Sequence, residues 1–188
     1  MSEKYKEILE HSYQLFAENG FDQTSMSLIA KQTGITKPAI YYYFNSKEKL
    51  IQTLFGHIID EIKFNNFFNP LEYTKDNFIS KLTEDGIKMM DKQLQDPYYN
   101  KIMNEYYVLS SRDAHYAKAL NTVLHEFLEG FLNLLKLAQK YGLLSEKDIQ
   151  TKAEFLTIIV DGLDKYSNEE YDLDPVAIWA FSVKSIFY

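Results

Sequence analysis

The chain has 188 residues, 46% of them hydrophobic, which is enough for one sizeable core or for a small module joined to a larger one. It contains no cysteine, which excludes disulfides, thiolate metal sites and cysteine nucleophiles. The net charge of −7 argues at first sight against nucleic acid as a partner, but the acidic excess lies mostly after residue 60, since residues 1–60 carry six lysines against seven acids.

Helical periodicity begins near the start of the chain. The first predicted helix ends at Asn19-Gly20, with glycine as the C′ residue, and its apolar face is formed by Tyr5, Ile8, Leu9, Leu15 and Phe16. Two short helices are predicted next, at roughly 26–33 and 37–43. A longer helix is expected from Ser46 to about Phe64.

The rest of the chain contains few helix breakers. Asn69-Pro70 and Asp96-Pro97 interrupt the middle region. Residues 110–113 offer a capping start to a long helix that runs to Tyr141-Gly142, and Asp174-Pro175 supplies an N-cap and an N1 proline for the last helix. Because no convincing alternating strand pattern is present, we predict an all-α fold of about nine helices.

Residues 25–45 meet the requirements of two helices that cross steeply through a tight turn. The first helix needs a small residue at the crossing, which Ala30 supplies, and the turn needs a residue that tolerates positive φ, which Gly34 supplies. Ile40 faces back into the crossing, and Pro38 lies in the first turn of the second helix, where its missing N–H costs nothing. The small core is completed by Ile29, Ile35 and Phe44. This joint spacing indicates a helix-turn-helix.

At these residues the chain resembles the tetracycline-repressor (TetR) family. Over about the first 55 residues the family's N-terminal signature is matched almost position for position by Leu15-Phe16-Ala17-Glu18-Asn19-Gly20-Phe21, Thr24-Ser25, Ile29-Ala30, Gly34-Ile35, Ile40-Tyr41-Tyr42-Tyr43-Phe44 and Ser46-Lys47-Glu48-Lys49-Leu50. The remaining residues match in length, helical character and layout. The resemblance implies a homodimer with an N-terminal operator-reading domain and a divergent C-terminal domain that binds a small effector and dimerises.

We therefore expect two domains. Residues 1–45 would form the helix-turn-helix DNA-binding domain, extending to about 60 with the connecting helix, and residues 46–188 would form a helical effector-binding and dimerisation domain. The expected function is that of a transcriptional regulator, most simply a repressor that binds a palindromic double-stranded DNA operator and is released by a small hydrophobic or aromatic effector. The alternative is a helix-turn-helix protein that acts mainly through a protein partner and binds DNA weakly.

The second short helix is the candidate recognition helix, which enters the major groove by its N-terminal end. Lys37, at that end, is expected to contact a guanine edge or a phosphate, while Ala39 would touch a thymine methyl or simply pack. Ile40 and Phe44 point inward, so the three tyrosines between them cannot all be core. The family pattern places the Tyr41 hydroxyl at the phosphate backbone and makes Tyr42 the more groove-facing residue.

Five further residues complete the expected DNA contacts. Ser25 and Thr36 stand at helix starts, with Ser27 close behind, and there a hydroxyl either caps the helix or donates to a phosphate. Pro38 is placed in the same set by its position on the recognition helix. Lys47 opens the fourth helix and is well placed for a phosphate.

The C-terminal part is rich in aromatic residues, which line an effector pocket or form plain core and dimer interface. As pocket-lining residues we predict Phe64, Phe67, Tyr106 and Tyr107. The last two helices, about 146–166 and 174–187, carry more apolar residues than one buried face needs, and we predict that they form a two-fold symmetric dimer interface. Gly162 would allow close helix approach there.

No catalytic or metal-binding pattern is present. The four histidines are scattered without metal-ligand spacing, and there is no glycine-rich phosphate loop or nucleophile elbow, so we expect neither an enzyme, nor a metal, nor a cofactor. The first ten residues are mostly polar and charged and contain no apolar signal-peptide core, and apolar stretches such as residues 155–160 are far shorter than the roughly 18 residues of a membrane span. We therefore expect a cytoplasmic protein with no membrane partner.

Overall fold

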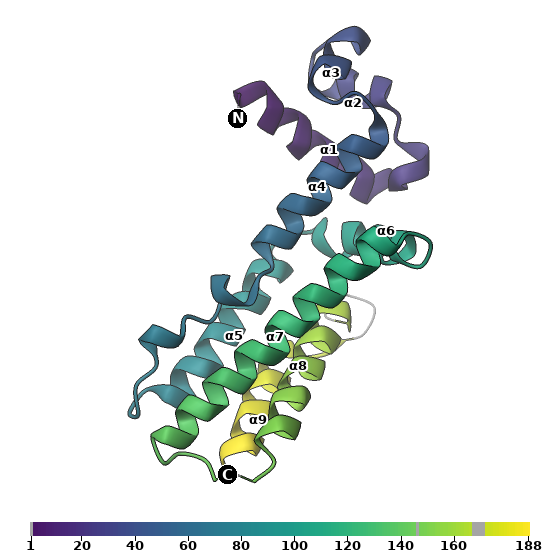
Figure 1. The fold of residues 1–188 in the computed structure, drawn as a ribbon. Helices are drawn as coiled ribbons and strands as arrows, with labels where there is room; N and C mark the ends of the chain where they lie inside the picture. The colour runs from purple at the N-terminus through teal and green to yellow at the C-terminus, as the bar shows by residue number, and fades with distance from the viewer. Residues whose placement is uncertain (1, 146, 167–171) are drawn as a thin grey trace. The chain divides into compact units, whose positions relative to one another are not determined.

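The computed structural model describes residues 2–145, 147–166 and 172–188. Within these ranges the structure is all-α, as the sequence predicts, with nine α-helices and two short 3₁₀ helices (Figure 1). In chain order the elements are α1 (Glu3–Gln23), α2 (Met26–Gln32), α3 (Lys37–Tyr43), α4 (Lys47–Glu61), η1 (Phe64–Asn66), η2 (Pro70–Glu72), α5 (Phe78–Leu94), α6 (Tyr99–Ser110), α7 (Ala114–Lys140), α8 (Ile149–Tyr166) and α9 (Pro175–Phe187). Among the described residues no helix combines the length and the apolar character that crossing a bilayer requires.

The helices pack into two compact units. The first contains the chain up to Glu61 together with Pro97–Ala117, and the second contains Ile62–Asp96 together with Lys118–Tyr188. The units therefore do not follow the chain in order, because α6 and the start of α7 pack with the N-terminal helices. The boundary between a DNA-binding and an effector-binding domain stays a prediction.

In the first unit α1 packs against α2, α4 and α6, and α2 packs against α3. Its core contains side chains from four of these helices, among them the fully buried Ile8, Ile29, Leu50 and Tyr106. The predicted end of the first helix at Gly20 is confirmed, since Gly20 has φ 78 and ψ 164 and divides α1 into a long helix and a short final turn. This backbone region is essentially restricted to glycine.

The predicted end of the fourth helix is wrong by a few residues. That helix ends at Glu61, and Lys63 is extended, with φ −65 and ψ 143. The break redirects the chain so that Phe64 and Phe68 both enter the core of the second unit, where their rings stack at 4.9 Å between centroids. Aromatic burial therefore overrides the helical periodicity that continues to Phe64 in the sequence.

In the second unit α9 packs against α5 and α8. The centre of this packing is Trp179, which is fully buried and whose indole N–H reaches the carbonyl oxygens of Leu82, at 3.3 Å, and Thr83, at 3.1 Å. Buried aromatic rings of the same core surround it, namely Phe68 and Phe131. The predicted start of the last helix is confirmed, because the Asp174 carboxylate accepts a hydrogen bond from the backbone N–H of Ala177.

Candidate DNA-binding site

The turn between α2 and α3 has the geometry that the sequence predicts. Gly34 has φ +65, and the N–H of Ile35 donates to the carbonyl of Ala30 at 2.9 Å, which closes the end of α2. Each helix begins with a hydroxyl cap: the Ser25 side chain accepts from the N–H of Leu28, and the Thr36 side chain accepts from the N–H of Ala39. These contacts fix the path of both helices.

A small core holds the two helices at their crossing. Ala30 is 2% exposed and Ile40 is completely buried, which confirms their predicted inward positions. Phe44, at the end of α3, is 2% exposed and stacks on the Tyr5 ring with 4.8 Å between centroids. The N-terminal helix therefore supports α3 from behind, and the side of α3 opposite Ile40 is left open to solvent.

Most of the predicted DNA-contacting residues are exposed to solvent. The exposed ones are Ser25, Ser27, Thr36, Lys37, Pro38, Tyr41 and Tyr42, and the half-buried ones are Ala39 and Lys47. Tyr42 is 86% exposed, and Tyr41 is 42% exposed. Folding therefore brings all nine residues into one unit, and their contacts with DNA stay a prediction.

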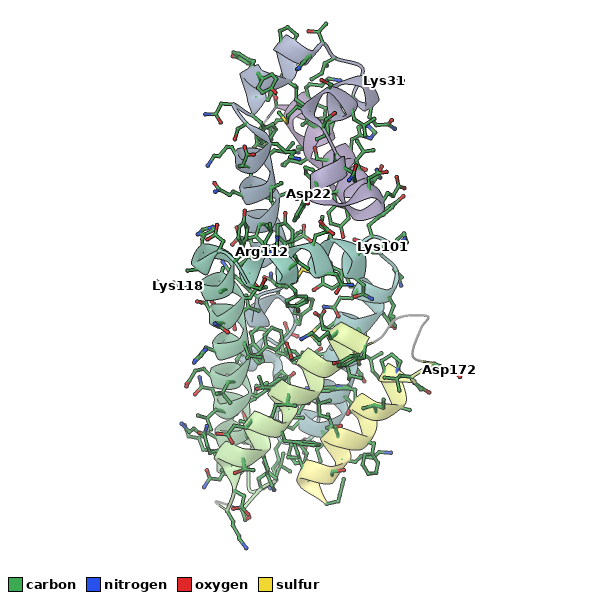
Figure 2. All side chains as sticks on the ribbon, turned by 90° about the vertical axis from the view of Figure 1, so that its right-hand side faces the viewer. Asp22, Lys31, Lys101, Arg112, Lys118 and Asp172 are labelled. Carbon is green, nitrogen blue, oxygen red and sulfur yellow. The ribbon has the colours of Figure 1, made fainter. Side chains whose placement is uncertain are left out.

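The helix-turn-helix differs in charge from the rest of the chain. Residues 23–47 contain three lysines and no aspartate or glutamate, although the whole chain has a net charge of −7. Lys31, labelled in Figure 2, is exposed at the end of α2, and Asp22, also labelled, is the last acidic residue before this segment. Because phosphate binding depends on local charge, the acidic total does not prevent this face from binding DNA.

Lys47 has an intramolecular role that the sequence does not reveal. Its ammonium group donates to the carbonyl oxygen of Phe21 at 2.8 Å and lies 3.5 Å from that of Asp22, at the end of α1. On the other side of the same turn the N–H of Phe21 donates to the Glu105 carboxylate of α6 at 2.8 Å. The turn after Gly20 is therefore held from both sides by charged side chains.

Tyr106, on α6, belongs to the core of the same unit. Its ring is completely buried against Phe21, Phe55 and Tyr116, and its hydroxyl donates to the carbonyl oxygen of Ile51 in α4 at 2.9 Å. Burial raises the pKa of this hydroxyl far above its ordinary value. No local sequence pattern predicts the contacts of α6 with α1 and α4, because the contacting residues are far apart in the sequence.

The four predicted effector-lining residues divide between the two units. Phe64 and Phe67 belong to the second unit, where Phe64 is buried among Phe68, Phe127 and Phe131. The other two, Tyr106 and Tyr107, belong to the first unit. The packing within either unit therefore does not gather the four rings, and a ligand site formed by them stays a prediction.

The last two helices expose a set of large apolar side chains. Phe155 and Ile158 of α8 are 39% and 68% exposed, and Phe181 of α9 is 72% exposed. On their other faces α8 and α9 bury Leu156, Val160 and Val183 in the core of the second unit. Both helices thus carry more apolar surface than their own unit covers.

Comparison with known proteins identifies the family. The model of the tetR family of bacterial regulatory proteins matches residues 8–54, which span the helix-turn-helix and its supporting helices. The chain belongs to the TetR family of transcriptional regulators. This membership also assigns the chain to regulators rather than enzymes, as the sequence predicts.

Relatives of this TetR-family chain extend beyond the helix-turn-helix. It is 23% identical over 180 residues to IcaR of Staphylococcus epidermidis, a negative transcriptional regulator of the biofilm operon icaADBC, and the match covers 81% of this chain and 95% of IcaR. Among solved structures, AibR in complex with isovaleryl coenzyme A and operator DNA has a TM-score of 0.69 at 18% identity, covering 98% of each chain. SmeT in complex with triclosan has a TM-score of 0.73 at 17% identity, covering 98% of this chain and 90% of SmeT. At these identities the two structures show a common fold.

Proposed function

We propose that this chain is a homodimeric repressor that binds a palindromic operator through α3 and is released by a small hydrophobic or aromatic effector. The observation that carries the proposal is the open face of α3, where Tyr42 is 86% exposed on a helix whose opposite side is anchored by the buried Ile40. A helix held in this way and left uncovered is what entry into a major groove requires.

The local charge and the relatives support the same function. The acid-free segment 23–47 supplies the positive charge that phosphates attract. IcaR is a negative regulator, and AibR was solved in complex with isovaleryl coenzyme A and operator DNA. SmeT was solved with triclosan, an aromatic compound. Repression, operator binding and the binding of a small molecule are therefore each found among the similar proteins.

Selection of bound DNA from a random pool tests the proposal. We expect a palindrome whose half-site centres are one helical turn apart, about 34–36 Å, or a multiple of that distance. On the selected operator, Lys37→Ala and Tyr42→Ala should each weaken binding by about 1–3 kcal/mol. Lys101→Ala removes an exposed lysine of α6 and serves as the control with unchanged affinity. A selection that returns no sequence would favour the alternative, a regulator that works through a protein partner.

The homodimer would form through α8 and α9. A second copy of the chain is the natural occupant of their exposed apolar face, because two recognition helices related by two-fold symmetry are needed to read both halves of a palindrome. We expect Phe181→Glu to shift the sedimentation of the protein from dimer to monomer at micromolar concentration. Leu71→Glu changes a side chain that is 93% exposed in η2 and should leave the dimer intact.

The effector would act by binding the DNA-incompetent state more tightly. Operator DNA must then weaken effector binding by the same factor, and a coupling of about 1–3 kcal/mol gives a useful switch. A thermal-shift screen of aromatic and cationic compounds, followed by operator titrations with each hit, measures this coupling. Compounds that stabilise the protein but leave operator affinity unchanged would disprove release while leaving a binding pocket in place.

A further inference from the structure

We propose that the half-site read by α3 is rich in A·T pairs and is recognised mainly by contact of Tyr42 and its neighbours with thymine methyl groups. This inference rests on the proposed function, because it concerns the same helix on the same operator. Of the four bases only thymine carries a methyl group in the major groove, whereas guanine presents two hydrogen-bond acceptors there. A recognition surface with apolar side chains therefore favours thymine, and one with hydrogen-bond donors favours guanine.

The outward surface of α3 follows from the buried position of Ile40. Each residue of an α-helix advances by about 100°, so Pro38 and Tyr42, two positions on either side of Ile40, lie on the opposite face. Ala39 and Tyr41 flank them. We define the α3 reading surface as these four residues: Pro38, Ala39, Tyr41 and Tyr42. It consists of the methylene groups of the proline ring, the methyl group of the alanine and two phenol rings.

The reading surface lacks the groups that identify guanine. None of its side chains carries a guanidinium, an ammonium or an amide, and the commonest specific contact to guanine is a bidentate one from arginine or lysine. Arg112 is the single arginine of the chain, and Figure 2 shows it well away from Lys31 within the first unit. Lys37, in the first turn of α3, is the one cationic residue of the helix. Readout of guanine by a cationic side chain of α3 is therefore limited to Lys37, at most one guanine per half-site.

The reading surface is also rigid. The Tyr42 ring meets the Tyr43 ring edge to face, with 5.4 Å between centroids and 89° between planes, and Tyr43 is itself half-buried. Pro38 has a fixed ring, and Ala39 has no side-chain torsion. A thymine methyl that packs against this surface gains burial of apolar area, and little side-chain freedom is lost in the process. Rigid apolar groups can therefore discriminate by shape without hydrogen bonds.

Replacement of thymine by deoxyuridine tests the inference, because it removes the methyl group and keeps every hydrogen-bonding atom of the base. The operator is first obtained by selection, and each thymine of one half-site is then replaced in turn. Binding is measured by fluorescence anisotropy at one salt concentration. At one or more positions we expect affinity to fall by about threefold to fivefold, and replacement in both half-sites should multiply the two losses.

A variant cycle assigns the effect to the reading surface. In Tyr42→Ala the deoxyuridine penalty should largely disappear, whereas in Lys37→Ala, which removes a charge from the same helix, the penalty should remain. Tyr42 is highly exposed, so its replacement leaves the fold intact, and far-UV circular dichroism with a thermal melt verifies this.

Three results would overturn the inference while leaving operator binding established. They are a half-site without thymine, a deoxyuridine series with no effect at any position, and a penalty that persists in full in Tyr42→Ala. If selection returns no operator, the proposed function fails and the inference fails with it, so the two failures are distinguishable.

Discussion

The two units use glycine for different physical reasons. In the first unit Gly20 and Gly34 have φ of +78 and +65, and a Cβ added at Gly34 would meet no atom within 4 Å, so conformation rather than space requires glycine there. In the second unit Gly86 and Gly130 lie within helices, and a Cβ at either position would overlap a buried ring, Trp179 or Phe64. Gly20 and Gly34 therefore serve the path of the backbone, whereas Gly86 and Gly130 serve the fit of the aromatic core. Gly142, with φ +74, is a conformational glycine of the second unit.

This difference predicts that Gly86→Ala is the most damaging of the single-methyl changes. The added methyl would collide with the indole of Trp179, which is fully buried and hydrogen-bonded through its N–H, so the ring has little room to move. We expect a loss of about 3 kcal/mol or more in the free energy of unfolding. Urea denaturation at fixed protein concentration measures it.

Gly56→Ala is the matched control. Gly56 lies within α4, is exposed, and has no atom within 4 Å of an added Cβ. The change should stabilise the protein by about 0.5–1 kcal/mol, because alanine restricts the unfolded chain and favours the helix. Equal effects of Gly86→Ala and Gly56→Ala would contradict the assignment of Gly86 to the packing of Trp179.

The contrast between the units explains how much the sequence could predict. The spacing of Ala30, Gly34 and Ile40 follows from the local geometry of a turn, so the helix-turn-helix and its family were predictable from sequence. The pairing of Gly86 with Trp179 joins helices distant in the chain, and one sequence contains no signal for it. The same holds for Glu105 and the turn at Phe21. Long-range packing, not local propensity, decided these features.

A second comparison uses one buried tyrosine from each unit. The Tyr73 hydroxyl donates to the Asp85 carboxylate at 2.8 Å, and both side chains are buried, whereas the Tyr106 hydroxyl donates to a neutral backbone carbonyl. Tyr73→Phe should cost about 1.5–3 kcal/mol, because it removes a hydrogen bond to a charged group, and Tyr106→Phe about 0.5–1.5 kcal/mol. Paired urea denaturations test this order.

The pH dependence of stability provides a further check on Tyr73. Burial, together with the hydrogen bond to Asp85, raises the pKa of Tyr73 far above its ordinary value. The contribution of the Tyr73 hydroxyl to the free energy of unfolding is therefore complete below a pH of about 10, which is the pKa of tyrosine in the unfolded chain. It declines as the pH rises further. The stability difference between the native protein and Tyr73→Phe should shrink above that pH. A constant difference would show that the hydroxyl does not titrate differently in the two states.

Gly20→Ala tests the conformational role of glycine in the first unit. The backbone at Gly20, with φ 78 and ψ 164, lies in a region that other residues rarely adopt. We expect a loss of about 1–3 kcal/mol from strain alone, since the nearest atoms to the added Cβ belong to the flexible Glu105 carboxylate at 3.4 Å and beyond. Glu105→Ala in the same background separates the two causes, because it removes the atoms nearest the added Cβ while the backbone strain persists.

Lys47→Ala has a small expected effect on stability and distinguishes structural from DNA-binding roles. Its ammonium group has three N–H donors, of which the carbonyl oxygens of Phe21, at 2.8 Å, and Asp22, at 3.5 Å, take two. The third donor can reach a phosphate, so one side chain can both hold the turn at the end of α1 and bind DNA. We expect a loss of about 0.5–1 kcal/mol in the free energy of unfolding, because the side chain is only partly buried.

Lys47→Ala should also lower the salt dependence of DNA binding. The slope of the logarithm of the binding constant against the logarithm of the salt concentration should fall by about one unit, with affinity reduced similarly on all sequences. Lys101→Ala, in the same unit, should change neither quantity. If Lys47→Ala lowers stability but leaves the salt slope unchanged, Lys47 holds the turn and does not contact DNA.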